Sequence, residues 1–144
     1  MAHSFVDYHG EHILLRDGDI IIVVYLMMAE KSRMAQSNSV PPFLGKLFEW
    51  WEELLEVYGP GCLDLKLDTF LTDEEARAFI TRLIDSTKQT ISAFGEAIPG
   101  DYLNRLVRAP DIIIFGDQPI GYAVGALERL KNLIILTHQG QDNL

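Results

Sequence analysis

Residues 20–29 read Ile-Ile-Ile-Val-Val-Tyr-Leu-Met-Met-Ala, the longest apolar run in the chain and the segment on which the fold depends. Its length of about 10 residues is too short for a transmembrane helix, which needs about 20. The first half is rich in β-branched and aromatic side chains, which favours a strand buried on both faces. A helix is possible after Tyr25. In the competing interpretation, Asp19 is the N-cap of a buried helix over residues 20–36.

The residues before this run predict a β-hairpin. Residues 12–16, His-Ile-Leu-Leu-Arg, form a shorter candidate strand. The dipeptide Asp17-Gly18 follows, and such a pair accepts the positive φ angles of a type I′ turn. We therefore expect a strand over residues 12–16 to pair with a strand over residues 20–25.

The middle of the chain predicts two helices with a strand between them. A helix begins at Pro42 and runs to about Tyr58, where Gly59-Pro60-Gly61 ends it. Leucines then alternate with charged residues over positions 63–68, the pattern of a half-buried strand. Thr72 and Glu75 form a capping box for a helix that Gly95 ends. Its predicted core face is Ala76, Phe79, Ile80, Leu83, Ile84, Thr87, Ile91 and Phe94.

The last third predicts short elements. Residues 101–108 read as a helix, residues 112–115 as a strand, residues 119–131 as a helix and residues 133–136 as a closing strand. The whole pattern predicts an α+β fold, a single domain over residues 1–144 with helices packed on a mixed sheet of four or five strands. A mostly α fold is the alternative if the runs at positions 20 and 112 are buried helices.

The charge of the chain excludes some classes of partner. Lys and Arg number 12 and Asp and Glu number 21, so the net charge is −9. This balance argues against binding to nucleic acid or to an anionic membrane through a positive field. The single cysteine, Cys62, cannot form an internal disulfide, and the first residues do not read as a charged and apolar leader. We expect a reducing, cytoplasmic location.

Three histidines near the N-terminus are the candidate metal ligands. His3, His9 and His12 lie close to Asp7 and Glu11, and transition metals accept imidazole and carboxylate ligands. Their spacing is not diagnostic, and a frayed, solvated terminus explains the same residues. We predict no metal site, although metal binding by these histidines stays open.

Neither Cys62 nor the glycine-bearing helix near the C-terminus indicates catalysis. Cys62 opens an acidic region, and nearby negative charge raises the pKa of a thiol, so we expect a buried structural cysteine. Gly121 and Gly125 lack the Lys-Ser/Thr of a phosphate-binding loop, and their spacing predicts close helix packing instead. We predict no catalytic residue and no cofactor.

The excess negative charge is concentrated in one segment. Residues 49–75 contain nine acids and a single base, Lys66, for a net charge of −8. The acids are Glu49, Glu52, Glu53, Glu56, Asp64, Asp68, Asp73, Glu74 and Glu75. On the helix after Pro42, the glutamates fall opposite a core arc made of Leu44, Leu47, Phe48, Trp51, Leu54, Leu55 and Tyr58. Phe43, Trp50 and Val57, seven residues apart, form a stripe between these two faces.

This acidic face has an ordinary explanation and a functional one. A solvated surface beside a broad core stripe would account for it. Alternatively, carboxylates steer a basic protein partner that a tryptophan anchors, because tryptophan is enriched at binding hot spots. The predicted partner-binding residues are Glu49, Trp50, Glu52, Glu53, Glu56, Asp64 and Asp68.

The leading hypothesis is a non-enzymatic, acidic protein-binding module. Its concrete form is a bacterial immunity or antitoxin-type inhibitor, since toxins that act on nucleic acid need a basic active site that an acidic protein can mask. One alternative is a small metal-dependent or small-molecule enzyme that uses the N-terminal histidines. Another is an oligomeric structural subunit that self-associates through the Trp50 stripe.

Overall fold

The apolar run at position 20 forms a helix. The computed structural model describes residues 2–34, 40–56, 61–107 and 115–142, and in it α1 (Asp17–Met34) contains the whole run. The predicted strand over residues 20–25 and the turn at Asp17-Gly18 are therefore wrong. The competing buried helix is right over residues 20–34, but it begins at Asp17, so Asp19 is not its N-cap, and residues 35–36 lie outside the described residues. Strand propensity measures how well side chains fit a half-buried pleated surface, whereas this run is enclosed on every side by helices and a hairpin.

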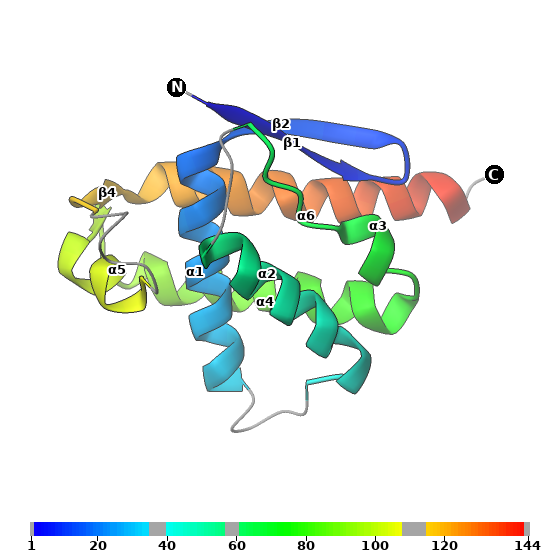
Figure 1. Ribbon diagram of the computed structural model, residues 1–144, viewed down its shortest axis with the longest axis horizontal. Coiled ribbons are helices and arrows are strands. Elements are labelled where there is room, and N and C mark those ends of the chain that lie inside the picture. Colours follow the sequence, from blue (N-terminus) through cyan, green and yellow to red (C-terminus); the bar gives the residue numbers. More distant parts are fainter. Residues whose placement is uncertain (1, 35–39, 57–60, 108–114, 143–144) are drawn as a thin grey trace.

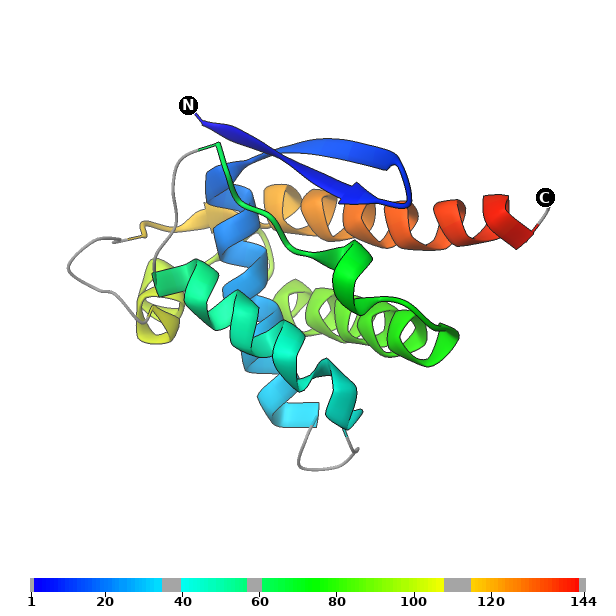
Figure 2. The same ribbon diagram turned by 45° about the vertical axis from the view of Figure 1, so that its right-hand side comes forward.

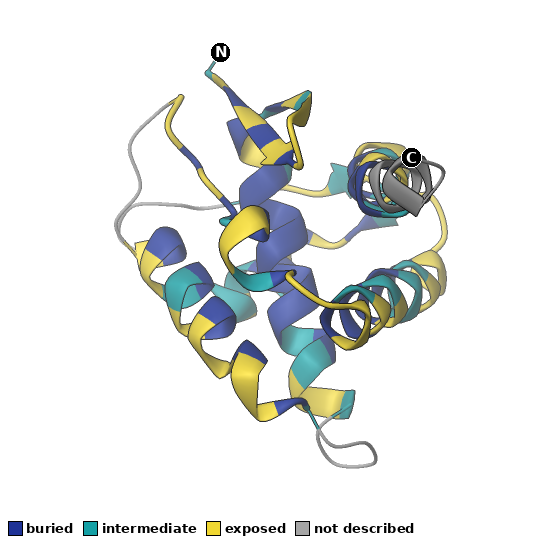
Figure 3. Ribbon diagram, turned by 90° about the vertical axis from the view of Figure 1, so that its right-hand side faces the viewer, coloured by how far each residue is buried: buried dark blue, intermediate teal, exposed yellow. Residues whose placement is uncertain are grey.

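Helix α1 is the centre of the molecule. It is in contact with α2 (Gly45–Glu56), α4 (Glu74–Ser92), α5 (Gly100–Leu106) and α6 (Ile120–Asp142), which surround it in Figure 1. Every residue from Ile20 to Met28 is buried, and Figure 3 shows this stretch as a continuous dark core. The described part of the chain is mostly helical, and its strands form two two-stranded sheets instead of the predicted sheet of four or five strands.

The N-terminal residues form a β-hairpin. The strands β1 (His3–Tyr8) and β2 (Glu11–Arg16) pair antiparallel, with Tyr8 opposite Glu11. The turn residues His9 and Gly10 both have positive φ, 51° and 80°. The candidate strand over residues 12–16 is thus confirmed, but its partner is the segment that we expected to be a frayed terminus. Figure 2 shows the hairpin lying over α1 and α6.

Residues 61–66 have no regular secondary structure and lie outside either sheet. The predicted alternation holds, because Leu63, Leu65 and Leu67 are buried while Asp64 is exposed. The predicted strand pairing is wrong, and α3 (Leu67–Phe70) follows at once.

The helix predicted from the capping box is α4. Its N-cap is Asp73, whose Oδ1 accepts a hydrogen bond from the Ala76 amide at 2.8 Å, one residue later than the predicted Thr72. All the predicted core positions are buried except Phe94, which is 37% exposed beyond the end of the helix. The predicted helices after Pro42 and at residues 101–108 are confirmed by η1 (Pro42–Leu44) with α2 and by α5.

The C-terminal part is one long helix. Helix α6 includes residues 120–131 of the predicted helix, and Pro119 lies in the strand before it. It also includes residues 133–136, so the predicted closing strand is wrong. Two-residue strands β3 (Ala97–Ile98) and β4 (Gln118–Pro119) pair before it. Residues 112–114 of the other predicted strand lie outside the described residues. None of the described helices is long and apolar enough to cross a membrane.

Gly121 and Gly125 of α6 do not serve close helix packing. A Cβ atom placed on Gly121 or Gly125 would meet no other atom within 4 Å, so that prediction is wrong. Gly100, at the start of α5, is the position where a side chain cannot fit. Its Cβ would lie 2.7 Å from the Phe115 carbonyl oxygen and 2.8 Å from the carbonyl carbon of Gly116.

Two glycine substitutions should therefore have opposite effects. Gly125→Ala should raise the free energy of unfolding by about 0.5–1 kcal/mol, because alanine lowers the entropy of the unfolded chain and meets no obstacle. Gly100→Ala should lower it by about 1–3 kcal/mol through the clash with backbone. Urea unfolding of the two variants beside the wild type measures both changes. A loss of stability in Gly125→Ala would show that this face of α6 is covered.

Candidate functional site

Helix α2 presents an acidic face to solvent. Glu49, Glu53 and Glu56 are exposed and Glu52 is half-buried. The opposite side of the helix packs in the core as predicted, with Leu44, Leu47, Phe48, Trp51, Leu54 and Leu55 all buried. Tyr58 and Val57 lie outside the described residues. Positions 49, 53 and 56 are spaced by four and three residues, so their carboxylates share one side of the helix.

This row of acids is not compensated by bases. Among the described residues, no salt bridge involves Glu49, Glu53 or Glu56. Asp85, in contrast, is paired: it accepts a hydrogen bond from Lys131 at 2.8 Å, which is the main reason why its pKa is lowered. Exposed acids outside α2, such as Glu11, Glu75 and Glu96, also have no salt bridge among the described residues. What distinguishes α2 is that it places three such acids on one helical face.

The two tryptophans of α2 hydrogen-bond to the segment over residues 61–66. The Trp50 indole donates a hydrogen bond to the Asp64 carbonyl at 2.7 Å, and the Trp51 indole donates to the Leu65 carbonyl at 3.0 Å. The Lys66 ammonium lies 3.8 Å from the centroid of the Trp50 ring. Trp50 thus makes a hydrogen bond and a cation–π contact within the chain. Its predicted role as an anchor for a partner stays a prediction, beside this structural role.

Two other predicted partner-binding residues also have contacts inside the chain. Asp64 Oδ1 accepts a hydrogen bond from the Lys66 amide at 2.8 Å, which supports the positive φ of Lys66. Asp68 Oδ1 accepts one from the amide of His9 at 2.7 Å, which joins α3 to the hairpin turn. Of the four glutamates of α2, three are exposed on one side of the helix, and these are defined here as the acidic row (Glu49, Glu53, Glu56).

A hydrogen-bond network around Ser4 and Asp17 joins three segments, and the sequence analysis did not predict it. The Ser4 hydroxyl donates a hydrogen bond to Asp17 Oδ1 at 2.6 Å, and the amide of Gly61 donates to Asp17 Oδ2 at 2.7 Å. The Leu63 amide donates to Ser4 Oγ at 3.0 Å. These bonds link the hairpin, the start of α1 and the segment that Trp50 and Trp51 hold. Nothing local in the sequence indicates contacts across separations of this size.

The N-terminal histidines are not gathered into a ligand set. His12 lies on a strand with its ring edge-on to Phe5, at 5.0 Å between centroids, and His9 lies in the turn. Within the described ranges, no group of three or more histidine, cysteine or carboxylate side chains could hold a metal ion. Cys62 is exposed, so the prediction of a buried cysteine is wrong.

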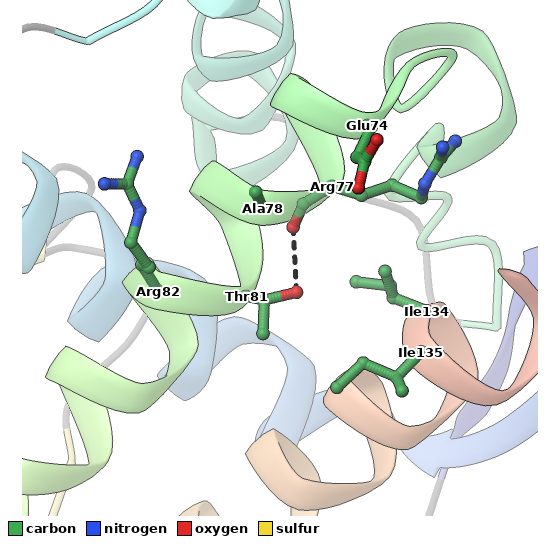
Figure 4. A pocket seen from close by; sticks show the side chains of 7 residues that line it. All are labelled: Glu74, Arg77, Ala78, Thr81, Arg82, Ile134 and Ile135. Atoms are coloured by element: carbon green, nitrogen blue, oxygen red, sulfur yellow. Dashed lines mark hydrogen bonds between the residues drawn. The ribbon is translucent and has the colours of Figure 1, made fainter. Parts of the chain in front are cut away.

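A cavity of about 370 Å³ lies between α4 and α6 (Figure 4). Ile134 and Ile135 border it from α6, and the residues that border it from α4 are Glu74, Arg77, Ala78, Thr81 and Arg82. The Thr81 hydroxyl is satisfied by donating to the Arg77 carbonyl at 2.8 Å. The Arg77 Nε is buried and has no hydrogen-bond partner within the described part of the chain. Sequence reasoning placed no site here.

Comparison of the chain with protein-family models, with curated proteins and with solved structures found no match. Function is therefore inferred from the geometry and charge of this chain alone.

Tyr8 should make the stability of the protein depend on alkaline pH. Its hydroxyl donates to the Leu71 carbonyl at 2.8 Å, and burial raises its pKa above the ordinary value of 10.0, with the Arg77 guanidinium opposing part of that rise. A raised tyrosine pKa contributes stability that is present below pH 10 and lost as the pH rises through the folded-state value.

Tyr8→Phe should cost about 1 kcal/mol at neutral pH, where the hydrogen bond is lost, and should flatten the fall in stability above about pH 10. Urea unfolding of both proteins between pH 7 and pH 11 tests this. Parallel losses in wild type and variant would assign the alkaline transition to other groups.

The tryptophan contacts predict a stability effect at both positions. Trp51→Phe should lower the free energy of unfolding by about 1–3 kcal/mol, because it removes a hydrogen bond and leaves a void in the core. Trp50→Phe should lower it by about 1 kcal/mol through the lost bond to Asp64. Chemical denaturation measures both. No change for Trp50→Phe would mean that its contact with Asp64 contributes nothing and that the ring is available to a partner.

Proposed function

We propose that this protein is a non-enzymatic binding module whose acidic row on α2 docks a basic protein. Its concrete form is an inhibitor of the immunity or antitoxin type, which covers the positively charged surface of a toxin or nuclease. The observation that carries the proposal is a set of three exposed carboxylates on one helical face without a salt bridge among the described residues.

The placement of these acids opposes the stability of their own helix. Glu53 and Glu56 lie in the last turn of α2, at the negative end of the helix dipole, where acids are unfavourable by about 0.3–1 kcal/mol each. Repulsion between Glu49 and Glu53, four residues apart, adds a few tenths of a kcal/mol. Neither cost has a structural benefit in the described contacts, which favours a use of the charge in recognition.

The acidic row is also held in a fixed position. Its helix is tied to α4 by Phe48, whose ring is edge-on to that of Phe79 at 6.3 Å between centroids, and to the neighbouring segment by the two indole hydrogen bonds. A preorganised set of charges raises the rate at which an oppositely charged partner associates, and it lowers the ordering cost of binding. The kind of partner that fits is a protein with a basic patch.

The other two hypotheses have less support. A metal-dependent enzyme that uses the N-terminal histidines would need them in a ligand set, and no group of three or more such side chains that could hold a metal ion occurs among the described residues. Self-association through the Trp50 stripe would need a free apolar ring, whereas Lys66 covers that ring. Phe43, at the start of the stripe, is 42% exposed.

A crosslinking and kinetics experiment tests the proposal. A photo-crosslinking residue at position 53, used in cells of the source organism, captures what contacts the acidic row. The same residue at the exposed Gln89 of α4 is the positional control. We expect a basic protein to be captured from position 53 and not from position 89.

The captured partner is then used with two charge-matched variants. Reversing Glu49, Glu53 and Glu56 to lysine changes the net charge by the same amount as reversing the exposed Glu11, Glu75 and Glu96. The first variant should associate about ten-fold more slowly or worse at low salt, and the loss should shrink at high salt because the charges are then screened. The second should change the association rate by less than about three-fold. Equal effects of the two variants would show that only net charge matters and would contradict a docking site on α2.

A further inference from the structure

The cavity between α4 and α6 has an apolar wall and two arginines in its lining. Ala78, Ile134 and Ile135 supply hydrocarbon, and Figure 4 shows the two isoleucines pointing from α6 toward α4. Arg77 and Arg82 both line the cavity from α4, and their side chains extend in opposite directions in Figure 4. The Arg82 guanidinium lies over the Phe79 ring, 5.8 Å from its centroid. The charge of Arg82 therefore already faces an aromatic ring, whereas the Nε of Arg77 has no hydrogen-bond partner among the described residues.

The buried Nε of Arg77 needs an acceptor. A guanidinium does not lose its proton in a protein, so each of its buried N–H groups remains a donor on a charged group and needs a hydrogen-bond acceptor. Leaving such a donor unpaired is costly, and hydrogen bonds between ionised groups are the strongest that side chains form. Because a guanidinium and a carboxylate match in plane and spacing, a carboxylate can accept from Nε and a neighbouring N–H together.

We propose that this cavity binds a monocarboxylate with a hydrocarbon tail, with the carboxylate on Arg77 and the tail along Ala78, Ile134 and Ile135. The volume of about 370 Å³ falls at the lower end of the range of about 300–1,000 Å³ that is usual for small-molecule sites. The polar and apolar parts of the cavity lie at different places, so head and tail each have a counterpart. This site is separate from the acidic row on α2.

Glu74 gives the proposal a second, opposite test. Its carboxylate also borders the cavity, beside Arg77 in Figure 4, and it is exposed. If an anion binds, this carboxylate repels it, so Glu74→Gln should tighten binding by about two-fold or more. If a cation were the ligand, Glu74 would be its counterion and the same substitution would weaken binding.

The test uses octanoate as the probe, with octanol and octylammonium as probes of the same length but neutral and positive heads. Titration of the full chain is followed by calorimetry and by the amide signals of α4 and α6. Octanoate should bind with a dissociation constant near or below about 1 mM, and each of the other two should bind at least ten-fold more weakly. Acetate, which lacks the tail, should not bind in that range.

Two variants and one control locate the site. Arg77→Gln should weaken octanoate at least ten-fold, and Arg105→Gln, which removes the same charge from an exposed position on α5 outside the cavity lining, should change it less than two-fold. Ala78→Leu fills the cavity at an exposed helical position and should abolish binding even if Arg77→Gln fails to fold. Equal binding of octanoate and octanol, unchanged binding in Ala78→Leu, or preference for octylammonium would each overturn the proposal.

Discussion

Helix α1 has no side that faces water between Ile20 and Met28, and the rest of the structure depends on covering it. A helix of this kind satisfies its own backbone hydrogen bonds but needs an apolar neighbour in every direction. Helices α2, α4, α5 and α6 and the hairpin supply those neighbours, each through one face. Their other faces are consequently left to carry charge, and the acidic row and the cavity both lie on these covering elements.

The two ends of α1 meet buried polar groups instead of water. Asp17 at its start accepts hydrogen bonds from Ser4 and Gly61. Glu30 near its end is also buried, and it accepts from the hydroxyls of Ser86 at 2.6 Å and Thr90 at 2.9 Å. A buried carboxylate is tolerated only when its acceptor sites are used, so both residues fix where the hairpin and α4 sit on α1. The fold thus combines a non-directional apolar core with two directional contacts at its ends.

The sequence was sufficient for the amphipathic elements and insufficient for the enclosed one. The core faces of α2 and α4 can be predicted from apolar residues such as Phe48 and Phe79. A helix with one face in water keeps a 3.6-residue period in its apolar positions. The apolar run that begins at Ile20 has no alternation of apolar and polar residues. The only remaining indicator of its secondary structure was its content of β-branched residues, which favoured a strand. The residues that α6 contributes after Leu133 were misread for the same reason.

The candidate sites show a similar division. The acidic row could be found from charge alone, since exposure of three glutamates on one helical face follows from spacing. The contacts of Trp50 with the Asp64 carbonyl and the Lys66 ammonium could not be predicted from the sequence, because they depend on how the segment after α2 returns along that helix. The cavity beside Arg77 depends on the distance between two helices that are far apart in the sequence, and no local pattern encodes it.

The central claim is that α1 is the last element to open. Native-state hydrogen exchange at increasing urea concentrations measures the opening free energy at each amide. The amides between Ile22 and Met28 should exchange only through global unfolding, with the same free energy and urea dependence as the whole protein, while amides of α2 and of the hairpin exchange through smaller openings. Exchange of the α1 amides at a lower free energy than global unfolding would contradict the account.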